Sequence, residues 1–276
     1  MLAPESLTWL HVKNRGEDFV RNCRFVAKFN RIELSDDNWI RIKRFSQSHA
    51  GTTTSNGKVY TFIDCFRTPL IRETLVLNLL CWFASSFGLF GTSYLSSAIA
   101  TDVYLDLAIE GLLALIPTFL ATYLSAKWGN RLPLTCYFFV GGIFAIIAGV
   151  IPASTTSQLA AANVMSFFSR MAYVATFCVT SIYTTELFPT VIRSSAFCLC
   201  FTALSIGCMV TPLLPLMVER VAFKGSGFLF VGLVSLLATL AAWLLRETKG
   251  LSLPETIEEV EQLRPRKRHW PGLPFT

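Results

Sequence analysis

Long apolar stretches alternate with short polar segments along most of the chain. Six of them approach the ~20 residues that an α-helix needs to cross a hydrocarbon core about 30 Å thick. Helices are expected because an open strand leaves its backbone groups unsatisfied in lipid, and the alternation typical of a membrane barrel does not occur. The pattern therefore predicts an all-α polytopic membrane protein with six transmembrane helices, at about 74–100, 103–126, 132–153, 159–182, 196–218 and 225–245.

The composition supports a membrane core with polar ends. Of the 276 residues, 53% are apolar and 15% are charged, and only eleven acidic or basic side chains lie among residues 75–245. This excludes a disordered chain and a disulfide scaffold and disfavours a soluble domain. We expect three parts: a cytosolic region at 1–72 with short amphipathic helices, a six-helix bundle at 73–246, and a cytosolic tail at 247–276 with a short acidic helix.

The Lys and Arg residues predict the orientation. Twenty-one of the 24 fall on one side of the predicted spans, whereas only Arg220 and Lys224 fall on the other and Arg170 lies within a span. Because cytosolic loops carry the excess of positive charge, both termini are expected in the cytosol. The net charge of +6 is read as this topology signal, and with no recognition motif beside it we expect no nucleic-acid partner.

Short helices are expected outside the spans. In the tail, the S-x-x-E pattern at 252–255 predicts a capped helix that runs to about residue 262. Near the beginning, apolar residues recur at helical spacing and predict an amphipathic helix; they are Phe19, Val20, Cys23, Val26 and Ala27. Both helices either pack against the membrane face as solvated elements or have a role of their own.

Three strings carry a family resemblance: PESLTWL at 4–10, YTTELFPTVIR at 183–193 and RETKGLSLPETIEEVE at 246–261. They resemble the motifs that follow helices six, ten and twelve of the organic cation, organic anion and carnitine transporters, which form solute carrier family 22 of the major facilitator superfamily. Their order and separations match the family. The resemblance implies that the chain corresponds to helices 7–12, the C-terminal half of such a transporter, with the plasma membrane as its location.

The resemblance also implies a function. In this superfamily one six-helix half rocks against the other around a site near the bilayer midplane, which gives alternating access to a small organic ion. One half supplies one wall of that site, so the chain is expected to need a second six-helix half or to form a homodimer, unless it is a truncated product. The alternative is a membrane receptor or regulatory protein that has lost transport.

An ionisable side chain inside a span is the sharpest functional feature, because each costs roughly 2.5–3.5 kcal/mol at the bilayer centre. Arg170 lies about 16 Å into its span at 1.5 Å per residue, near mid-membrane. It forms either a cationic wall of the central cavity or a buried pair with an acid of the second span. Asp106 and Glu110 lie one turn apart on that span, and the depth of Glu110 makes a Glu110–Arg170 pair the specific hypothesis.

Three further cavity positions come from two aromatic residues and from one departure from the family pattern. Phe90 and Tyr173 could line an organic-ion cavity by stacking and cation–π contact, or they could serve in packing alone. Ser205 stands where family members carry a charged residue in the eleventh helix. The substrate class is therefore not carried over from the family.

The remaining candidates lie at the membrane edge and are assigned a structural or gating role. Pro189 ends the fourth span where a missing N–H costs little, and Glu186 and Arg193 are placed to pair across the turn or to cap a neighbouring helix. In the loop after the second span, Gly129 and Arg131 remain of a family D-x-x-G-R-R pattern. Ala126 and Asn130 replace the acid and the first arginine of that pattern.

Nothing in the sequence points to catalysis. The eight cysteines form no C-x-x-C pair, the three histidines all lie in the terminal segments, and no nucleophile–base constellation or phosphate-binding loop is visible. We therefore expect no enzyme activity, no metal and no cofactor. The expected partners are a small organic ion, the lipid bilayer and a second six-helix bundle.

Overall fold

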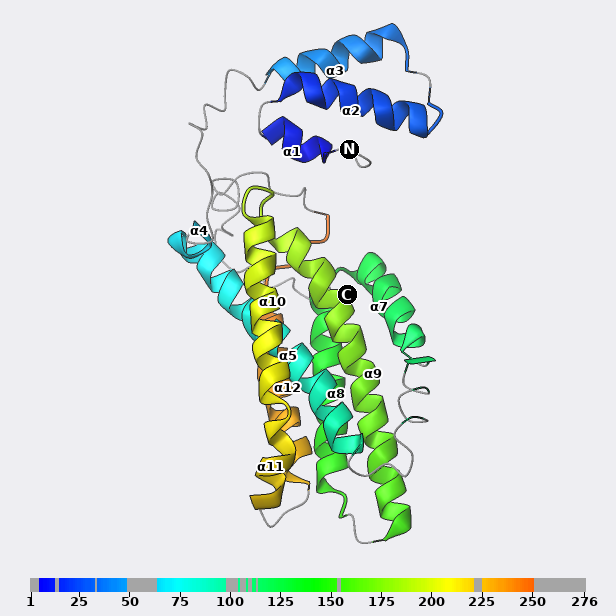
Figure 1. The fold of residues 1–276 in the computed structure, drawn as a ribbon, viewed down its shortest axis with the longest axis vertical. Coiled ribbons are helices and arrows are strands. Elements are labelled where there is room, and N and C mark those ends of the chain that lie inside the picture. Colours follow the sequence, from blue (N-terminus) through cyan, green and yellow to red (C-terminus); the bar gives the residue numbers. More distant parts are fainter. Residues whose placement is uncertain are drawn as a thin grey trace, which may run out of the picture. The chain divides into compact units, whose positions relative to one another are not determined.

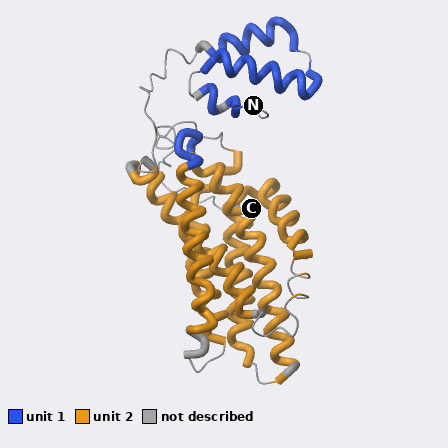
Figure 2. Tube along the Cα trace, in the orientation of Figure 1, with its two compact units in different colours: residues 1–64, 189–194, 253–276 blue, residues 65–188, 195–252 orange. Residues whose placement is uncertain are grey.

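The structure is a computed structural model. It describes residues 5–12, 15–32, 34–48, 64–97, 104, 108, 111–112, 114–152, 155–220 and 225–250. The chain divides into two compact units, coloured separately in Figure 2. Unit 1 comprises residues 1–64, 189–194 and 253–276, and unit 2 comprises residues 65–188 and 195–252.

Three helices form most of the described part of unit 1 and are labelled in Figure 1: α1 (Leu7–Val12), α2 (Gly16–Phe29) and α3 (Asp36–Ser48). Helix α2 contains all the apolar positions from which an amphipathic helix is predicted. Its Phe19 ring lies 5.8 Å from the His11 ring and 6.3 Å from the Phe45 ring, and the His11 and Phe45 rings stack at 4.6 Å. These aromatic contacts join the three helices.

Unit 2 is a bundle of long apolar helices. The two best-packed pairs are α8 with α12 and α8 with α9, while α5 packs on α9 and α12, and α7 packs on α9. The helices, which Figure 1 shows side by side, are α4 (Asp64–Arg67), α5 (Pro69–Ser97), α7 (Leu115–Trp128), α8 (Arg131–Val150), α9 (Thr156–Leu187), α10 (Arg193–Val210), α11 (Leu213–Arg220) and α12 (Ser226–Leu244).

Small residues allow the central helices to approach closely. A side chain on Gly142 would lie 3.2 Å from the backbone oxygen of Gly232 in α12, and one on Gly149 would lie 2.8 Å from that of Gly225. Gly141 instead faces the ring of Tyr173 in α9. The small residues of α8 therefore fix its packing against two neighbours.

Five described helices are long and apolar enough to cross a membrane, which confirms the predicted all-helical membrane fold. The first of them begins at Pro69, before the expected residue 74, and the fourth expected span extends to Leu187. The second expected span is described only in part: residues 103, 105–107, 109–110 and 113 lie outside the described residues, and α7 represents its latter part. The predicted tail helix at 252–262 also lies outside them.

The fifth expected span differs from the prediction of a continuous helix. It consists of α10 and α11, which are separated by a turn at Thr211–Pro212. Proline has no backbone N–H, so the hydrogen bond that would continue the helix through Pro212 cannot form. The Thr211 hydroxyl donates to the Gly207 carbonyl over 2.7 Å and caps the end of α10.

Candidate functional site

Arg170 and Tyr173 are buried in the middle of α9. Arg170 is 1% exposed and Tyr173 is fully buried, in a helix long and apolar enough to cross a membrane. The structure therefore places the guanidinium inside protein rather than against lipid, as its cost in hydrocarbon requires. Both acids that were predicted as its partners, Asp106 and Glu110, lie outside the described residues, so the Glu110–Arg170 pair stays a prediction.

Tyr173 sits in a narrow slot between α5 and α8. A side chain on Gly88 would lie 2.6 Å from the Tyr173 ring, and one on Gly141 would lie 3.2 Å from it. The hydroxyls of Ser169 and Ser235 are the polar neighbours of the phenol oxygen. They donate to backbone oxygens of α8, at Gly141 and Phe138, over 2.8 and 2.7 Å. Tyr173 therefore joins four helices.

The other predicted cavity residues lie in different surroundings. Phe90 is 40% exposed on α5, and Ser205 is exposed on α10 and donates to the Phe201 carbonyl over 3.0 Å. Among the described members of the predicted set, the structure thus separates a buried part, Arg170 and Tyr173, from a part on exposed helix faces, Phe90 and Ser205.

A buried polar cluster joins α5, α9 and α10, and it was missed by the sequence analysis. Thr184 accepts hydrogen bonds from the Asn78 amide over 3.0 Å and from the Trp82 indole over 2.8 Å. The Asn78 amide also lies 3.2 Å from the Cys200 sulfur. Asn78 is an isolated amide in the apolar run LVLNLLC, which is the signal that could have revealed it.

The membrane-edge residues form a second group, named here the loop cluster: Gly129, Asn130, Glu186, Glu247 and Thr248. Glu186, at the end of α9, accepts hydrogen bonds from the Asn130 amide and the Thr248 hydroxyl, each over 2.6 Å. Asn130 precedes α8 and Thr248 follows α12. One carboxylate therefore ties together three segments that are far apart in the sequence.

The Glu247 carboxylate also contacts the α7–α8 loop, at Gly129. It accepts the backbone N–H groups of Thr248 and Lys249 over 3.0 and 3.2 Å. It also lies against the α-carbon of Gly129, which ends α7 with φ +88°. Glycine fits here because any side chain would meet both an unfavourable φ and the Glu247 carboxylate.

Arg131 fixes the beginning of α8 to the end of α12. Its guanidinium lies 4.8 Å from the centre of the Trp243 ring and donates to the Trp243 backbone oxygen. Nearby, the Tyr183 hydroxyl donates to the backbone oxygen of Arg246. Burial lowers the pKa of the Arg246 guanidinium, an effect that Tyr183 partly opposes.

The roles predicted for Pro189 and Arg193 remain predictions. Both residues belong to unit 1, whereas Glu186 belongs to unit 2, and the structure gives Glu186 the partners Asn130 and Thr248. Among the described residues, no three His, Cys, Asp or Glu side chains gather where they could hold a metal ion.

Comparison with known proteins identifies the family. The family described as sugar (and other) transporter matches residues 1–260. Solute carrier family 22 member 6-A of Xenopus laevis is 29% identical over 94% of this chain and 45% of its own length. Member 3 of Rattus norvegicus is 26% identical over 98% and 47%, and member 13 of Homo sapiens is 28% identical over 98% and 46%.

The fold and the buried charge define a multi-pass helical membrane protein. The chain belongs to the sugar (and other) transporter family of the major facilitator superfamily, and its similarity to solute carrier family 22 members extends over nearly its whole length. The resemblance of the three sequence strings is thereby confirmed, and the family is one of transporters rather than enzymes. The chain spans about half the length of the curated relatives it matches.

Proposed function

We propose that the chain moves small organic ions across a membrane by alternating access, as one six-helix half of a transporter. The observation that carries this proposal is Arg170, a guanidinium only 1% exposed in the middle of a membrane-spanning helix. Because a cation at that depth costs free energy, charged residues are rare in transmembrane helices that serve only in packing. In a transporter, such a charge contributes either to the solute-binding site or to an ion pair that breaks during the transport cycle.

The loop cluster is proposed to act as a gate at the end of the bundle where α9 and α12 end and α8 begins. The Glu186 carboxylate holds Asn130 and Thr248 together, so α8, α9 and α12 move as one body while these hydrogen bonds persist. Gly129 and Arg131 are assigned to the same gate, and a structural or gating role for Pro189 and Arg193 is proposed from their place in the ELFPTVIR string alone. A gate of this kind changes the rate of the conformational step without touching the solute.

A second six-helix half or a second copy of the chain is proposed to face α10. This helix and the first residues of α11 form the least buried of the five candidate spans, and α5 forms the most buried. Ser205 and Thr202 lie exposed on α10, so part of this face is polar. Both termini are placed in the cytosol, and the plasma membrane is the proposed location.

Uptake into vesicles tests the proposal. The chain is reconstituted and assayed with labelled organic cations and, separately, labelled organic anions, beside the variants Arg170→Gln and Arg170→Lys. We expect Arg170→Gln to lower the uptake at least ~10-fold, which corresponds to about 1.4 kcal/mol, with partial retention in Arg170→Lys. Lys127→Gln, which removes an exposed cation outside the spans, is the matched control. Uptake equal to that of empty vesicles for every probe would refute transport by this chain.

A second candidate function is binding without transport, as in a receptor or regulatory protein. Two neutral residues favour it, because Ser205 and Asn130 stand where the family pattern carries charge. The same preparation distinguishes the two functions by equilibrium binding. Saturable binding of an organic ion without uptake, weakened in Arg170→Gln, would support the second candidate.

A further inference from the structure

Helix α2 of unit 1 has two apolar faces, of which one packs on other described helices of the unit. The face that includes Phe19 packs on the aromatic side chains of α1 and α3. On the other face Phe25 and Phe29, with Ile32 just beyond the end of the helix, are exposed to 51%, 79% and 56%. The Phe25 and Phe29 rings stack on each other, with centroids 6.4 Å apart, and so form a continuous apolar ridge.

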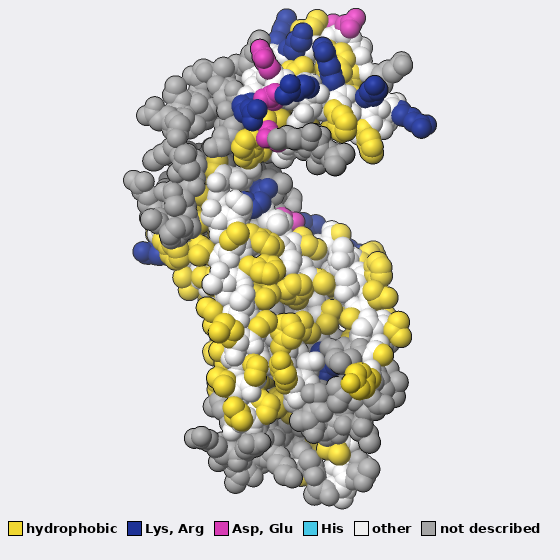
Figure 3. All heavy atoms as spheres, viewed as in Figure 1, with side chains coloured by type: hydrophobic (Ala, Val, Ile, Leu, Met, Phe, Trp, Pro, Cys, Tyr) yellow, Lys and Arg dark blue, Asp and Glu magenta, His cyan; other side chains and the backbone are white. Residues whose placement is uncertain are grey.

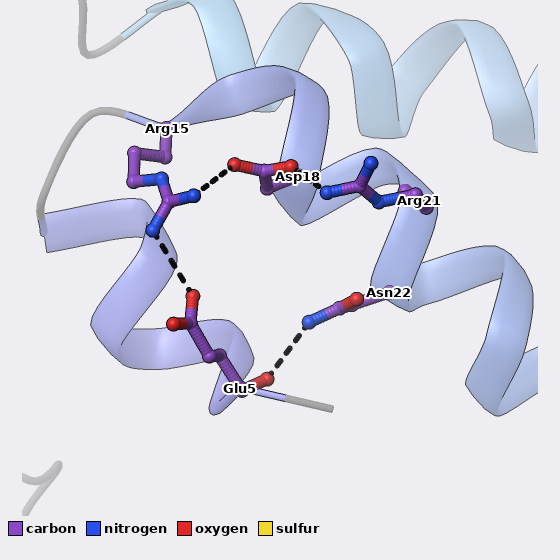
Figure 4. Close-up of polar contacts among 5 residues, drawn as sticks. All are labelled: Glu5, Arg15, Asp18, Arg21 and Asn22. Atoms are coloured by element: carbon purple, nitrogen blue, oxygen red, sulfur yellow. Dashed lines mark hydrogen bonds and ion pairs between the residues drawn. The ribbon is translucent and has the colours of Figure 1, made fainter. Parts of the chain in front are cut away.

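Positive charge flanks this ridge. Residues 21–32 contain four Lys and Arg and no Asp or Glu. The acids of α2, Glu17 and Asp18, lie in its first turn, and Asp18 is held by ion pairs to Arg15, over 2.7 Å, and to Arg21, as Figure 4 shows. Asp18 and Arg21 thus neutralise each other, whereas Lys28 and Arg31 lie on the exposed surface farther along, where residues 22–32 contain no acid.

Figure 3 shows a related contrast on the face that it displays. Lys and Arg side chains, with some Asp and Glu, gather over unit 1 with apolar patches between them, whereas the helices of unit 2 present mainly apolar and uncharged side chains. An exposed mixture of aromatic rings and cations on one helix is typical of a segment that lies in the interface of a bilayer. If this face met only water, its aromatic rings would form an exposed apolar patch, and such patches usually mark a site of interaction.

We propose that this face of α2 binds the anionic surface of the membrane that the same chain spans. The α2 docking face is defined as Phe25, Lys28 and Phe29 of α2 together with Arg31 and Ile32, which follow its C-cap. Its rings would enter the headgroup layer and its cations would meet lipid phosphates and carboxylates.

The connectivity of the chain argues for lipid as the occupant. Helix α3 ends at Ser48 and the first span begins at Pro69, so unit 1 is tethered to a bilayer at high effective concentration. The charge is complementary as well, because an anionic leaflet attracts Lys and Arg, whereas an apolar protein groove would have to desolvate them. The proposal does not depend on solute transport.

Photocrosslinking in the full chain tests the proposal. Phe29→p-benzoylphenylalanine keeps an aromatic ring at the most exposed position, and the protein is reconstituted in nanodiscs of pure phosphatidylcholine or with 30% phosphatidylserine. We expect mass spectrometry to show phospholipid attached to the α2 peptide, with a clearly higher yield in the anionic nanodiscs. About 1 M salt, where the screening length is roughly 3 Å, should abolish the difference.

A charge-matched pair of variants separates the docking face from general attraction. Lys28→Gln with Arg31→Gln should lower the anionic-lipid yield by up to ~25-fold, from about 5-fold for each cation. Arg41→Gln with Lys43→Gln removes the same charge from exposed positions of α3 and should have a much smaller effect. Crosslinks to unit 2, to a second copy or to an added protein in place of lipid would overturn the proposal, as would equal yields in the two lipid compositions.

Discussion

The Asn130 amide donates to the Glu186 carboxylate over 2.6 Å, so a neutral side chain holds an acid where the family pattern carries an arginine. Asn130 is 4% exposed and also lies 3.5 Å from the Thr248 hydroxyl, which binds the same carboxylate oxygen. The loop cluster therefore keeps its connection between α8, α9 and α12 without an ion pair at this position. Its strength rests on charge-assisted hydrogen bonds.

We predict that Asn130→Ala destabilises the protein by about 1–2 kcal/mol, because the half-buried Glu186 carboxylate loses a donor. Asn130→Asp should be worse, since it adds a second carboxylate beside Glu186. Thermal unfolding in detergent measures both. In the background of Glu186→Gln the Asp variant should regain most of its loss, and failure to do so would contradict a direct interaction between the two positions.

Gly129 and Gly250 form a natural matched pair for testing the α7–α8 loop. Both have positive φ, +88° and +79°, but a side chain on Gly129 would meet the Glu247 carboxylate and one on Gly250 has nothing within 4 Å. Gly250→Ala should cost about 1–2 kcal/mol from the backbone alone, and Gly129→Ala should cost at least ~1 kcal/mol more. Glu247→Ala should remove only the excess. Equal unfolding temperatures for the two Ala variants would contradict the contact.

The slot around Tyr173 predicts a size-dependent effect. Gly88→Ala places a methyl group 2.6 Å from the Tyr173 ring and should destabilise the bundle by about 1–3 kcal/mol through overpacking. Tyr173→Leu frees space in the slot, so the double variant should be more stable than the sum of the single effects predicts. A double-mutant cycle on thermal unfolding measures this coupling. Additive effects would show that the ring does not occupy the slot.

Much of the fold could be predicted from composition, whereas the contacts could not. An apolar run of about 20 residues identifies a span without any knowledge of its neighbours, which is why five described spans match the prediction. The Asn78–Thr184 hydrogen bond joins residues 106 positions apart, and nothing in either local sequence names the other. The break at Thr211–Pro212 was readable, because Pro212 stands inside the expected helix.

The candidate site shows the same division. The burial of Arg170 follows from the cost of a charge in lipid, and the sequence predicts it. The split of the cavity residues does not follow, because Phe90 and Ser205 lie in apolar runs that look the same on every face. The hydrophobic pattern in a membrane span does not distinguish lipid-facing from protein-facing positions as it does in water.

Cys23 provides a pH-dependent reporter in unit 1. Burial raises the pKa of its thiol above the ordinary value of 9.0, so it holds less thiolate at neutral pH than an exposed cysteine does. Maleimide should label Cys23 more slowly than it labels an exposed cysteine introduced as Asn30→Cys in a Cys23→Ala background. The labelling rate of Cys23 should rise about 10-fold per pH unit, because the thiolate is the reactive form. Because the neutral thiol is favoured in the folded state, its burial costs nothing at neutral pH and destabilises unit 1 as the pH rises above about 9. Equal rates at the two positions would contradict the burial of Cys23.

Arg31 follows the C-cap of α2 and has a backbone conformation that usually favours glycine. Its φ is +55°, its N–H donates to the Lys28 carbonyl over 3.2 Å, and the Ile32 N–H reaches back to the Ala27 carbonyl over 2.9 Å. This is the hydrogen-bond pattern of a Schellman motif, in which a side chain at the left-handed position costs roughly 1 kcal/mol.

We therefore predict that Arg31→Gly stabilises the end of α2 by about 0.5–1 kcal/mol. In the full chain, amide hydrogen exchange of the Ile32 N–H should be several-fold slower in Arg31→Gly than in the wild type. Arg31→Lys keeps both the charge and the strained φ, so its exchange should match the wild type. If the charge at this position serves lipid binding, Arg31→Gly should also lower the photocrosslinking yield of the α2 docking face while Arg31→Lys retains it. A helix end that gains no protection in Arg31→Gly would show that Arg31 does not adopt the left-handed conformation.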